Sequence, residues 1–262
     1  MERRQYHIDC CKGDVSRYVL LPGDPARISI ISQIWDSVQE VAIHREYKTN
    51  TGVYKGVLIS AVSTGIGSPS AGIAVEELAR IGVDTMIRVG SCGTIQPNIE
   101  CGSLVISTGA VRLEGTSKQY VRPEYPAVAS YEIVLALMEA AELLGCNYHV
   151  GVTASTDSFY CGQGRVGFGG YNSSMTENLI SDLQKARVLN LEMETATILT
   201  LASLFGLRAG SICTVFAVGQ DKFEPRGEKE AAQVASEAVK ILSDWDARKD
   251  ITGKKYWYPS LR

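Results

Sequence analysis

Two arginines lie beside glycine-containing turns, and the first is in VLLPGDPAR (residues 19–27). A short apolar strand is expected to run into a helix that begins near Pro25. Gly23 can then offer its backbone N–H to a ligand, and Arg27 lies one turn into the helix. A helix N-terminus with a glycine and an arginine is suited to bind an anion. The alternative is an ordinary strand–helix turn in which Asp24 caps the helix.

The second arginine, Arg88, lies between two β-branched residues in MIRVGSCG (residues 86–93). A buried arginine requires an anionic partner, and ligands of open α/β sheets bind beyond the carboxyl ends of strands. Ser91 adds a hydroxyl group at that end. One charge pair at about 4 Å and an effective dielectric of about 20 contributes about 4 kcal/mol before desolvation. Two or three converging arginines would therefore hold free phosphate; the alternative for Arg88 is an internal ion pair.

Two acids flank a methionine in NLEMETAT (residues 190–197), where a strand is followed by a helix. Glu192 and Glu194 share one side of an extended chain and diverge once the helix begins. We expect one of them to be structural and the other to face a ligand. A carboxylate in a cleft can accept hydrogen bonds from sugar hydroxyls and favour the positive charge of a loosening glycosidic bond. Acids that only decorate a helix N-terminus are the alternative.

A glycine-rich stretch carries side chains that could recognise a planar amide. Gln163 offers donors and an acceptor, Arg165 offers only donors, and together they match the edge of a nucleobase. Phe159 could stack on the face of that base. The alternative is a surface loop with a chance Gln and Arg. The segment Cys161–Ser174 is expected to be an irregular loop that could act as a mobile lid.

Apolar β-branched runs alternate with helical patterns along the chain, which predicts one α/β domain over residues 1–262 with a mixed or mainly parallel sheet. Strands are expected at Tyr18–Leu21, Gly56–Val62, Thr85–Val89, Ser103–Ser107, His149–Thr153, Val188–Leu191 and Gly210–Val218. Helices are expected at Pro25–Ile34, Ser68–Ile81, Ser130–Leu144, Thr176–Lys185, Met193–Phe205 and Lys229–Trp245. The basic tail over residues 247–262 is expected to be a solvated or packed end without its own function.

The composition excludes several classes of protein. The net charge of −3 gives no global positive field that would attract nucleic acid or an anionic membrane. Seven scattered cysteines without a CxxC pattern are typical of a reducing compartment and not of zinc sites. The N-terminus lacks the apolar core of a signal peptide, and no apolar run could cross a bilayer. We therefore expect a cytoplasmic protein.

Taken together, six motifs in a fixed order resemble the nucleoside phosphorylase-I family, and most closely its uridine-cleaving members. They are PGDPAR, HRE, STGIGSPS, IRVGSCG, GVTASTDSFYCGQGR and NLEMETAT, and the resemblance covers nearly the whole chain. It implies an α/β sandwich around a mixed, partly barrel-like sheet, and a homohexamer built as a trimer of dimers. The implied activity is reversible phosphorolysis of uridine to uracil and ribose 1-phosphate in pyrimidine salvage, with phosphate as co-substrate and no required cofactor.

The resemblance also implies a role for each matching residue. Phosphate would be bound by Gly23, Arg27, Arg88, Ser91 and, from the neighbouring subunit, Arg45. Ribose would be held by Met193, Glu194 and the neighbour's His7, and the base by Phe159, Gln163 and Arg165. A monovalent cation, expected to be potassium, would lie at Glu46, Ile66 and Ser70. Catalysis would rest on positioning and charge, without a covalent nucleophile, through Arg88, Glu194, Gln163 and Arg165.

The sequence departs from the family pattern in two places. Bacterial members carry an Asn-Arg pair after the last strand, whereas Val218 and Gly219 align there; Lys222 or Arg226 could substitute. Purine-specific relatives place an aspartate near Ala217, and its absence argues against purine cleavage. Broader nucleoside specificity, covering deoxyuridine, thymidine or purine nucleosides, remains an alternative. So do a nucleosidase that uses water and a non-catalytic nucleoside-binding protein.

Overall fold

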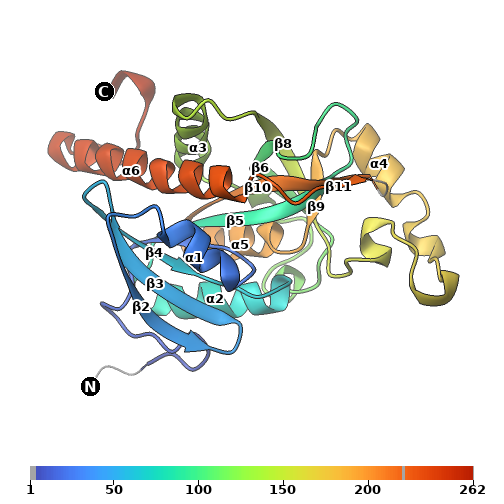
Figure 1. The fold of residues 1–262 in the computed structure, drawn as a ribbon, viewed down its shortest axis with the longest axis horizontal. Helices are drawn as coiled ribbons and strands as arrows, with labels where there is room; N and C mark the ends of the chain where they lie inside the picture. The colour runs from blue at the N-terminus through green and yellow to red at the C-terminus, as the bar shows by residue number, and fades with distance from the viewer. Residues whose placement is uncertain (1–3, 220–221, 262) are drawn as a thin grey trace.

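The computed structural model describes residues 4–219 and 222–261. Five strands at the centre of the fold form a closed ring, in which each strand pairs with the next and the last pairs with the first. In order they are β5 (Thr85–Thr94), β10 (Arg208–Val218), β6 (Leu104–Arg112), β8 (Tyr148–Ser155) and β9 (Asn190–Glu192). The β10–β6 and β9–β5 pairs are antiparallel and the other three are parallel. The ring is therefore a closed mixed barrel, which lies in the middle of the molecule (Figure 1).

The sheet continues outward from β5, and two short strands complete it. Beyond β5 the order is β1 (Tyr18–Leu21), β4 (Val57–Val62), β3 (Tyr47–Tyr54) and β2 (Ser37–His44); β7 (Ala127–Val128) pairs with β6 and β11 (Lys222–Phe223) with β10. On one side β5 pairs with β1 through Arg88 and then with β9 from Gly93. The sheet thus opens along β5 between these two residues.

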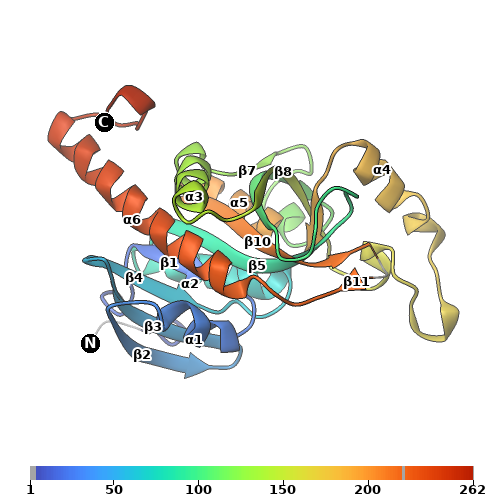
Figure 2. The ribbon, with the colours of Figure 1, turned by 45° about the horizontal axis from the view of Figure 1, so that its top comes forward.

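Helices cover both faces of this sheet. The first layer holds α1 (Ala26–Ser32), α3 (Tyr131–Leu143) and α6 (Glu228–Thr252); the second holds α2 (Ser68–Arg80) and α5 (Thr195–Leu204). Figure 2 shows α6 running along one side of the barrel, and α4 (Leu179–Lys185) at the far end. No helix of residues 4–219 and 222–261 is long and apolar enough to cross a membrane.

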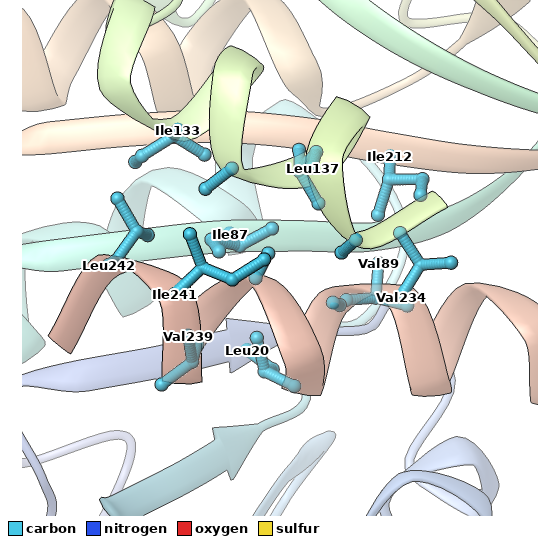
Figure 3. Close-up of a cluster of buried hydrophobic side chains, with 14 of the residues drawn as sticks. Leu20, Ile87, Val89, Ile133, Leu137, Ile212, Val234, Val239, Ile241 and Leu242 are labelled. Atoms are coloured by element: carbon cyan, nitrogen blue, oxygen red, sulfur yellow. The ribbon is translucent and has the colours of Figure 1, made fainter. Parts of the chain in front are cut away.

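Strand residues alternate between the two helical layers because successive side chains of a strand point to opposite faces. Leu20 and Ile87 pack in the cluster formed with α3 and α6, where Figure 3 shows Ile87 near Ile241 and Leu20 near Val239. Met86, the neighbour of Ile87, instead packs in the cluster formed with α2 and α5. These two cores hold β1 and β5 rigidly, and so fix the strand ends that carry the predicted arginines.

The predicted α/β class with a mixed, partly barrel-like sheet is confirmed, and every predicted strand and helix has a counterpart. The hairpin of β2 and β3 was missed. β2 pairs with β3 up to His44 and Tyr47, so Arg45 and Glu46 form the turn, with Arg45 at a φ of 56°. The first four residues of β2 are exposed. Because no face of this segment has to be apolar, it lacks the alternation of apolar and polar residues by which a half-buried strand is recognised.

The last helix extends further than predicted, ending at Thr252 and not at Trp245. The chain then turns back, and Trp257 stacks on Trp245 with ring centroids 3.7 Å apart. Lys249 pairs with Glu132 at 2.7 Å and with Asp246 at 2.9 Å. Part of the predicted tail is therefore helix, and the rest as far as residue 261 is anchored by a buried ring.

Candidate active site

A cavity of about 710 Å³ lies where the sheet opens along β5. Most residues that the sequence analysis assigned to a site line it: Gly23, Arg27, Glu46, Ile66, Arg88, Ser91, Phe159, Gln163, Arg165, Met193 and Glu194. They come from the start of α1 and the residues just after β1 and β9, from β5, and from the loops that follow β4 and β8. Glu46 comes from the turn between β2 and β3. Segments far apart in the sequence thus meet in one cleft, as expected for a ligand site in an α/β sheet.

Arg27 reaches across the cavity to other elements. Its Nε donates to Glu228 at 2.7 Å, its Nη2 donates to the hydroxyl of Ser91 at 3.1 Å, and its guanidinium lies 5.5 Å from the ring centroid of Phe216. The carboxylate of Asp24 accepts the N–H of Ala26 at 2.8 Å. Asp24 therefore caps the first turn of α1, and Arg27 supplies the positive charge.

Arg88 is almost completely buried and lies between two acids. Its Nε donates to Glu192 at 2.7 Å and its Nη2 pairs with Glu194, so the internal ion pair is present. Burial on its own would lower the pKa of Arg88, but the charges of Glu194 and Glu192 raise it overall. Its buried Nη1 has no hydrogen-bond partner among the described residues. An unpaired donor of this kind is costly unless a ligand accepts from it.

The two acids have different surroundings. Glu192 accepts the backbone N–H groups of Glu194 and Thr195, each at 2.9 Å, and the hydroxyl of Ser155, so its oxygens are occupied within the protein. Glu194 accepts the N–H of Gly67 and contacts Arg88. Burial raises the pKa of Glu194, and the charge of Arg88 opposes that rise. Glu192 is thus the better-anchored acid, and Glu194 has capacity for further donors.

The three predicted base-binding residues contact one another. Arg165 Nη1 donates to Gln163 Oε1 at 2.6 Å and to the carbonyl of Phe159 at 2.7 Å, and its guanidinium lies 4.1 Å from the Phe159 ring centroid. Because the Gln163 oxygen is occupied, its amide nitrogen remains to donate to a ligand. Burial lowers the pKa of Arg165. A smaller hollow of about 180 Å³ adjoins this group and shares Gln163 and Arg165 as lining.

Of the two suggested substitutes for the missing arginine, Lys222 lines the cavity. Arg226 instead donates to the carbonyl of Cys101 at 2.8 Å. Gly219 lines the cavity as well, whereas residues 220 and 221 lie outside the described residues. Lys222 is therefore the better-placed cation for the base.

Three predicted site residues do not line the cavity of this chain: His7, Arg45 and Ser70. His7 Nδ1 bonds to buried Glu77 at 2.8 Å, and the guanidinium of Arg45 lies 5.9 Å from the ring centroid of Tyr6. Ser70 donates to the carbonyl of Ile66 at 3.1 Å. Within residues 4–219 and 222–261 no three His, Cys, Asp or Glu side chains gather as metal ligands.

Sequence reasoning missed Glu228, Phe216 and Glu77. Glu228 accepts a hydrogen bond from Arg27 and Phe216 packs against its guanidinium, and both come from elements near the other end of the chain. The only sequence signal for Glu228 was that a partly buried arginine needs an acidic partner, and this does not identify the acid. Glu77 lies within a predicted helix, where its burial against His7 gives no local signal.

Comparison with known proteins agrees with the resemblance found in the motifs. The family model for the phosphorylase superfamily matches residues 17–244. The chain belongs to the phosphorylase superfamily. It is 63% identical over all 262 residues to the uridine phosphorylase of Thermococcus kodakarensis, covering 95% of that protein. The resemblance inferred from the motifs is thus confirmed.

More distant relatives include two activities. The uridine phosphorylase of Klebsiella aerogenes is 40% identical over 240 residues, which cover 90% of this chain and 94% of that protein. The guanosine phosphorylase of Halorubrum lacusprofundi is 43% identical over 212 residues, covering 81% of this chain and 83% of that protein. At this level of identity the relatives thus include both a uridine phosphorylase and a guanosine phosphorylase.

Proposed function

We propose that this chain is an enzyme of pyrimidine salvage, a pentosyltransferase that reversibly converts uridine and phosphate to uracil and ribose 1-phosphate. The observation that carries the proposal is the unpaired Nη1 of buried Arg88 in a cavity that also holds Arg27 and Ser91. Guanidinium N–H groups form strong, charge-assisted hydrogen bonds to phosphate oxygens. The similarity to a uridine phosphorylase over the whole chain supports the same activity.

Phosphate would lie among Gly23, Arg27, Arg88 and Ser91, below C1′ of the ribose. One of its oxygens forms a bond to C1′ as the bond from C1′ to uracil N1 breaks, and the electron pair leaves with the base. Phosphate is the co-substrate, and no metal cofactor takes part in the step. Positioning of the two reactants removes much of the entropic barrier.

The acid and the base-binding group would stabilise the two charges that develop. Glu194 would accept hydrogen bonds from the ribose hydroxyls and favour the positive charge at C1′, with Met193 packed beside the sugar. The amide of Gln163 and the guanidinium of Arg165 would stabilise negative charge on the uracil carbonyls, with Phe159 against the base. Donors that point to a developing charge in a water-poor site contribute strongly to catalysis.

A neighbouring subunit would complete each site. His7 and Arg45 lie outside the cavity of their own chain, and His7 is held by Glu77. We propose that they reach the ribose 5′-hydroxyl and the phosphate of the adjacent subunit in a cytoplasmic homohexamer, a trimer of dimers. Glu46, Ile66 and Ser70 would hold a potassium ion, and the loop over residues 161–174 would close as a lid.

The assay is uracil release from uridine by the purified protein with and without inorganic phosphate. We expect release that depends on phosphate. Equal release without phosphate would make the protein a nucleosidase, and nucleoside binding without any release would make it a binding protein; either result rejects the proposal.

Guanosine is the second candidate substrate because one relative at 43% identity is a guanosine phosphorylase. The hollow that adjoins Gln163 and Arg165 gives additional room beside the base. Around Ala217 the described residues that line the cavity are Phe216, Gly219, Lys222 and Phe223, and none of them is an acid that could protonate a purine, which favours uridine. A panel of uridine, deoxyuridine, thymidine, guanosine and inosine with phosphate measures this directly, and we expect the highest kcat/KM for uridine.

A further inference from the structure

We propose that Glu228 is the positioning residue of the phosphate site, because it holds the guanidinium of Arg27 so that its Nη atoms face phosphate. The inference rests on the proposed phosphorolysis and adds a residue that neither the motifs nor the resemblance assigned. Glu228 does not touch the reacting atoms in this arrangement. It acts through Arg27, on the side of the guanidinium away from the ligand.

Three contacts determine how the guanidinium of Arg27 lies. Glu228 accepts from Nε at 2.7 Å, Ser91 accepts from Nη2 at 3.1 Å, and the Phe216 ring lies 5.5 Å from the guanidinium carbon. The Nε edge is therefore occupied by an acid. Nη2 is directed toward Ser91, and both Arg27 and Ser91 line the cavity.

Arg88 is held in the same manner. Glu192 accepts from its Nε, also at 2.7 Å, and its Nη1 has no partner among the described residues. Both arginines of the proposed phosphate site are thus held at Nε by a glutamate. Arg88 Nη2 also pairs with Glu194, so its Nη1 is the atom left for an anion. Because Arg88 and Arg27 come from different strand ends, this repeated arrangement does not follow from local sequence.

Glu228 is itself fixed by the main chain. It is the first residue of α6, a helix of 25 residues whose next turn buries Ala231 and Ala232. Gly227 precedes it with a φ of 90°, and its carbonyl accepts from Thr214 on β10 at 3.0 Å. A Cβ on Gly227 would lie 2.6 Å from Thr214 Cγ2, so only glycine fits. The helix therefore presents Glu228 to Arg27 from a constant position.

The charge of Glu228 also makes the proposal easy to contradict. A carboxylate close to a bound phosphate repels it, so if repulsion dominated, removing Glu228 would tighten phosphate binding. If Glu228 acts by positioning, its removal weakens phosphate binding instead, because a released Arg27 must be ordered again each time phosphate binds. The pair is partly exposed, with 34% of the Glu228 side chain accessible, so its removal has little effect on folding.

The experiment compares E228Q and E228A with a matched control, E230Q. Glu230 lies in the same first turn of α6 and is exposed, so E230Q makes the same change in helix-terminal charge. We expect KM for phosphate to rise about tenfold in E228A, which corresponds to about 1.4 kcal/mol. E228Q, which can still accept from Nε, should fall between E228A and the wild type. KM for uridine and the E230Q parameters should change less than about twofold.

A second readout does not require turnover. Inorganic phosphate should raise the Tm of the wild type and of E230Q, and the increase at the same phosphate concentration should be smaller in E228Q and smallest in E228A. Unchanged or lower KM for phosphate in both Glu228 variants overturns the positioning role while leaving phosphorolysis intact. A wild type that phosphate neither activates nor stabilises overturns both the proposed function and this inference.

Discussion

Two clusters of arginine and acid in this molecule differ in whether every donor has a partner. At the end of the sheet away from the cavity, Arg208 bonds through all three nitrogens to Thr85, Asp246 and Glu132. In the cavity, Arg88 pairs with two acids but leaves its buried Nη1 without a described partner.

The difference distinguishes an ion network that serves the fold from one that serves a ligand. A buried charge pair stabilises a protein only when its remaining donors and acceptors are satisfied. The Arg208 cluster meets this condition and ties β5, β10, α3 and α6 together. The Arg88 cluster meets it only when an anion accepts from the remaining donor, which is the role that we propose for phosphate.

The largest expected effect is on activity at Arg88. R88A should lower kcat/KM for phosphate by about a thousandfold, because the buried cation that would hold and orient the attacking phosphate is lost. R88K keeps a positive charge beside Glu192 and Glu194 but lacks the planar fork, so it should also lose most of the activity while remaining folded. Steady-state kinetics with circular dichroism measures this. A folded R88K with wild-type kcat/KM would remove Arg88 from the phosphate site.

The counterpart variant is R208A, which should change stability and leave the chemistry alone. Removing Arg208 leaves Asp246 without its main partner and Glu132 with Lys249 as its remaining cation, at a cost of about 3 kcal/mol in the free energy of unfolding. Its kcat/KM at a temperature where it is folded should stay within about twofold of the wild type. Denaturant unfolding and kinetics together provide the check. If R208A lost activity without losing stability, the Arg208 cluster would serve the reaction as the Arg88 cluster does, and the distinction between the two clusters would be wrong.

The same cluster predicts how stability depends on pH. Burial would raise the pKa of Asp246, but hydrogen bonds from Arg208, Tyr18 and Lys249 hold it well below the usual range. A depressed pKa in the folded state stabilises the fold above the unfolded value of about 3.9, and that contribution is lost as the pH falls further. Unfolding curves below about pH 4 should therefore show a steep loss of stability.

D246N is the control for this pH effect. Because its amide does not titrate, its stability should be lower at neutral pH and fall less steeply on acidification. Equal slopes for D246N and the wild type would show that the acid sensitivity arises elsewhere in the molecule.

The smallest expected effect concerns Lys222, which lines the cavity near the base. K222A should raise KM for uridine about threefold, since a half-exposed cation contributes little in water. K229A, also exposed and a few residues further along, is the matched control. If KM for uridine is the same in K222A and the wild type, Lys222 does not replace the arginine that bacterial relatives carry.

The fold could be predicted where local pattern determines structure. The apolar strand of Arg88 and the helical pattern over Lys229–Trp245 were recognised because burial determines where apolar residues fall along the sequence. The closure of the barrel was not visible in any period, since it depends on pairs such as Thr85 with Arg208 that are far apart in the chain. Only the resemblance to a family supplied that feature.

The cationic residues of the site could be predicted from the sequence, whereas the acids that hold them could be predicted less well. Arg27 and Arg88 stand out because arginine at a glycine-rich strand end is chemically unusual. The acids that hold them, Glu192 and Glu228, are determined by tertiary contacts, and surface acids of the same type are common. The sequence therefore indicated an anion site, a possible internal partner for Arg88 and one structural acid, but it did not indicate which acids hold the two arginines.

The central claim is that inorganic phosphate, not water, takes the ribose from uridine. ³¹P NMR of the purified protein with uridine and phosphate tests it directly. The account predicts a new phosphomonoester resonance from ribose 1-phosphate that grows in the same molar amount as uracil. Uracil accompanied by free ribose, with the phosphate signal unchanged, would contradict it.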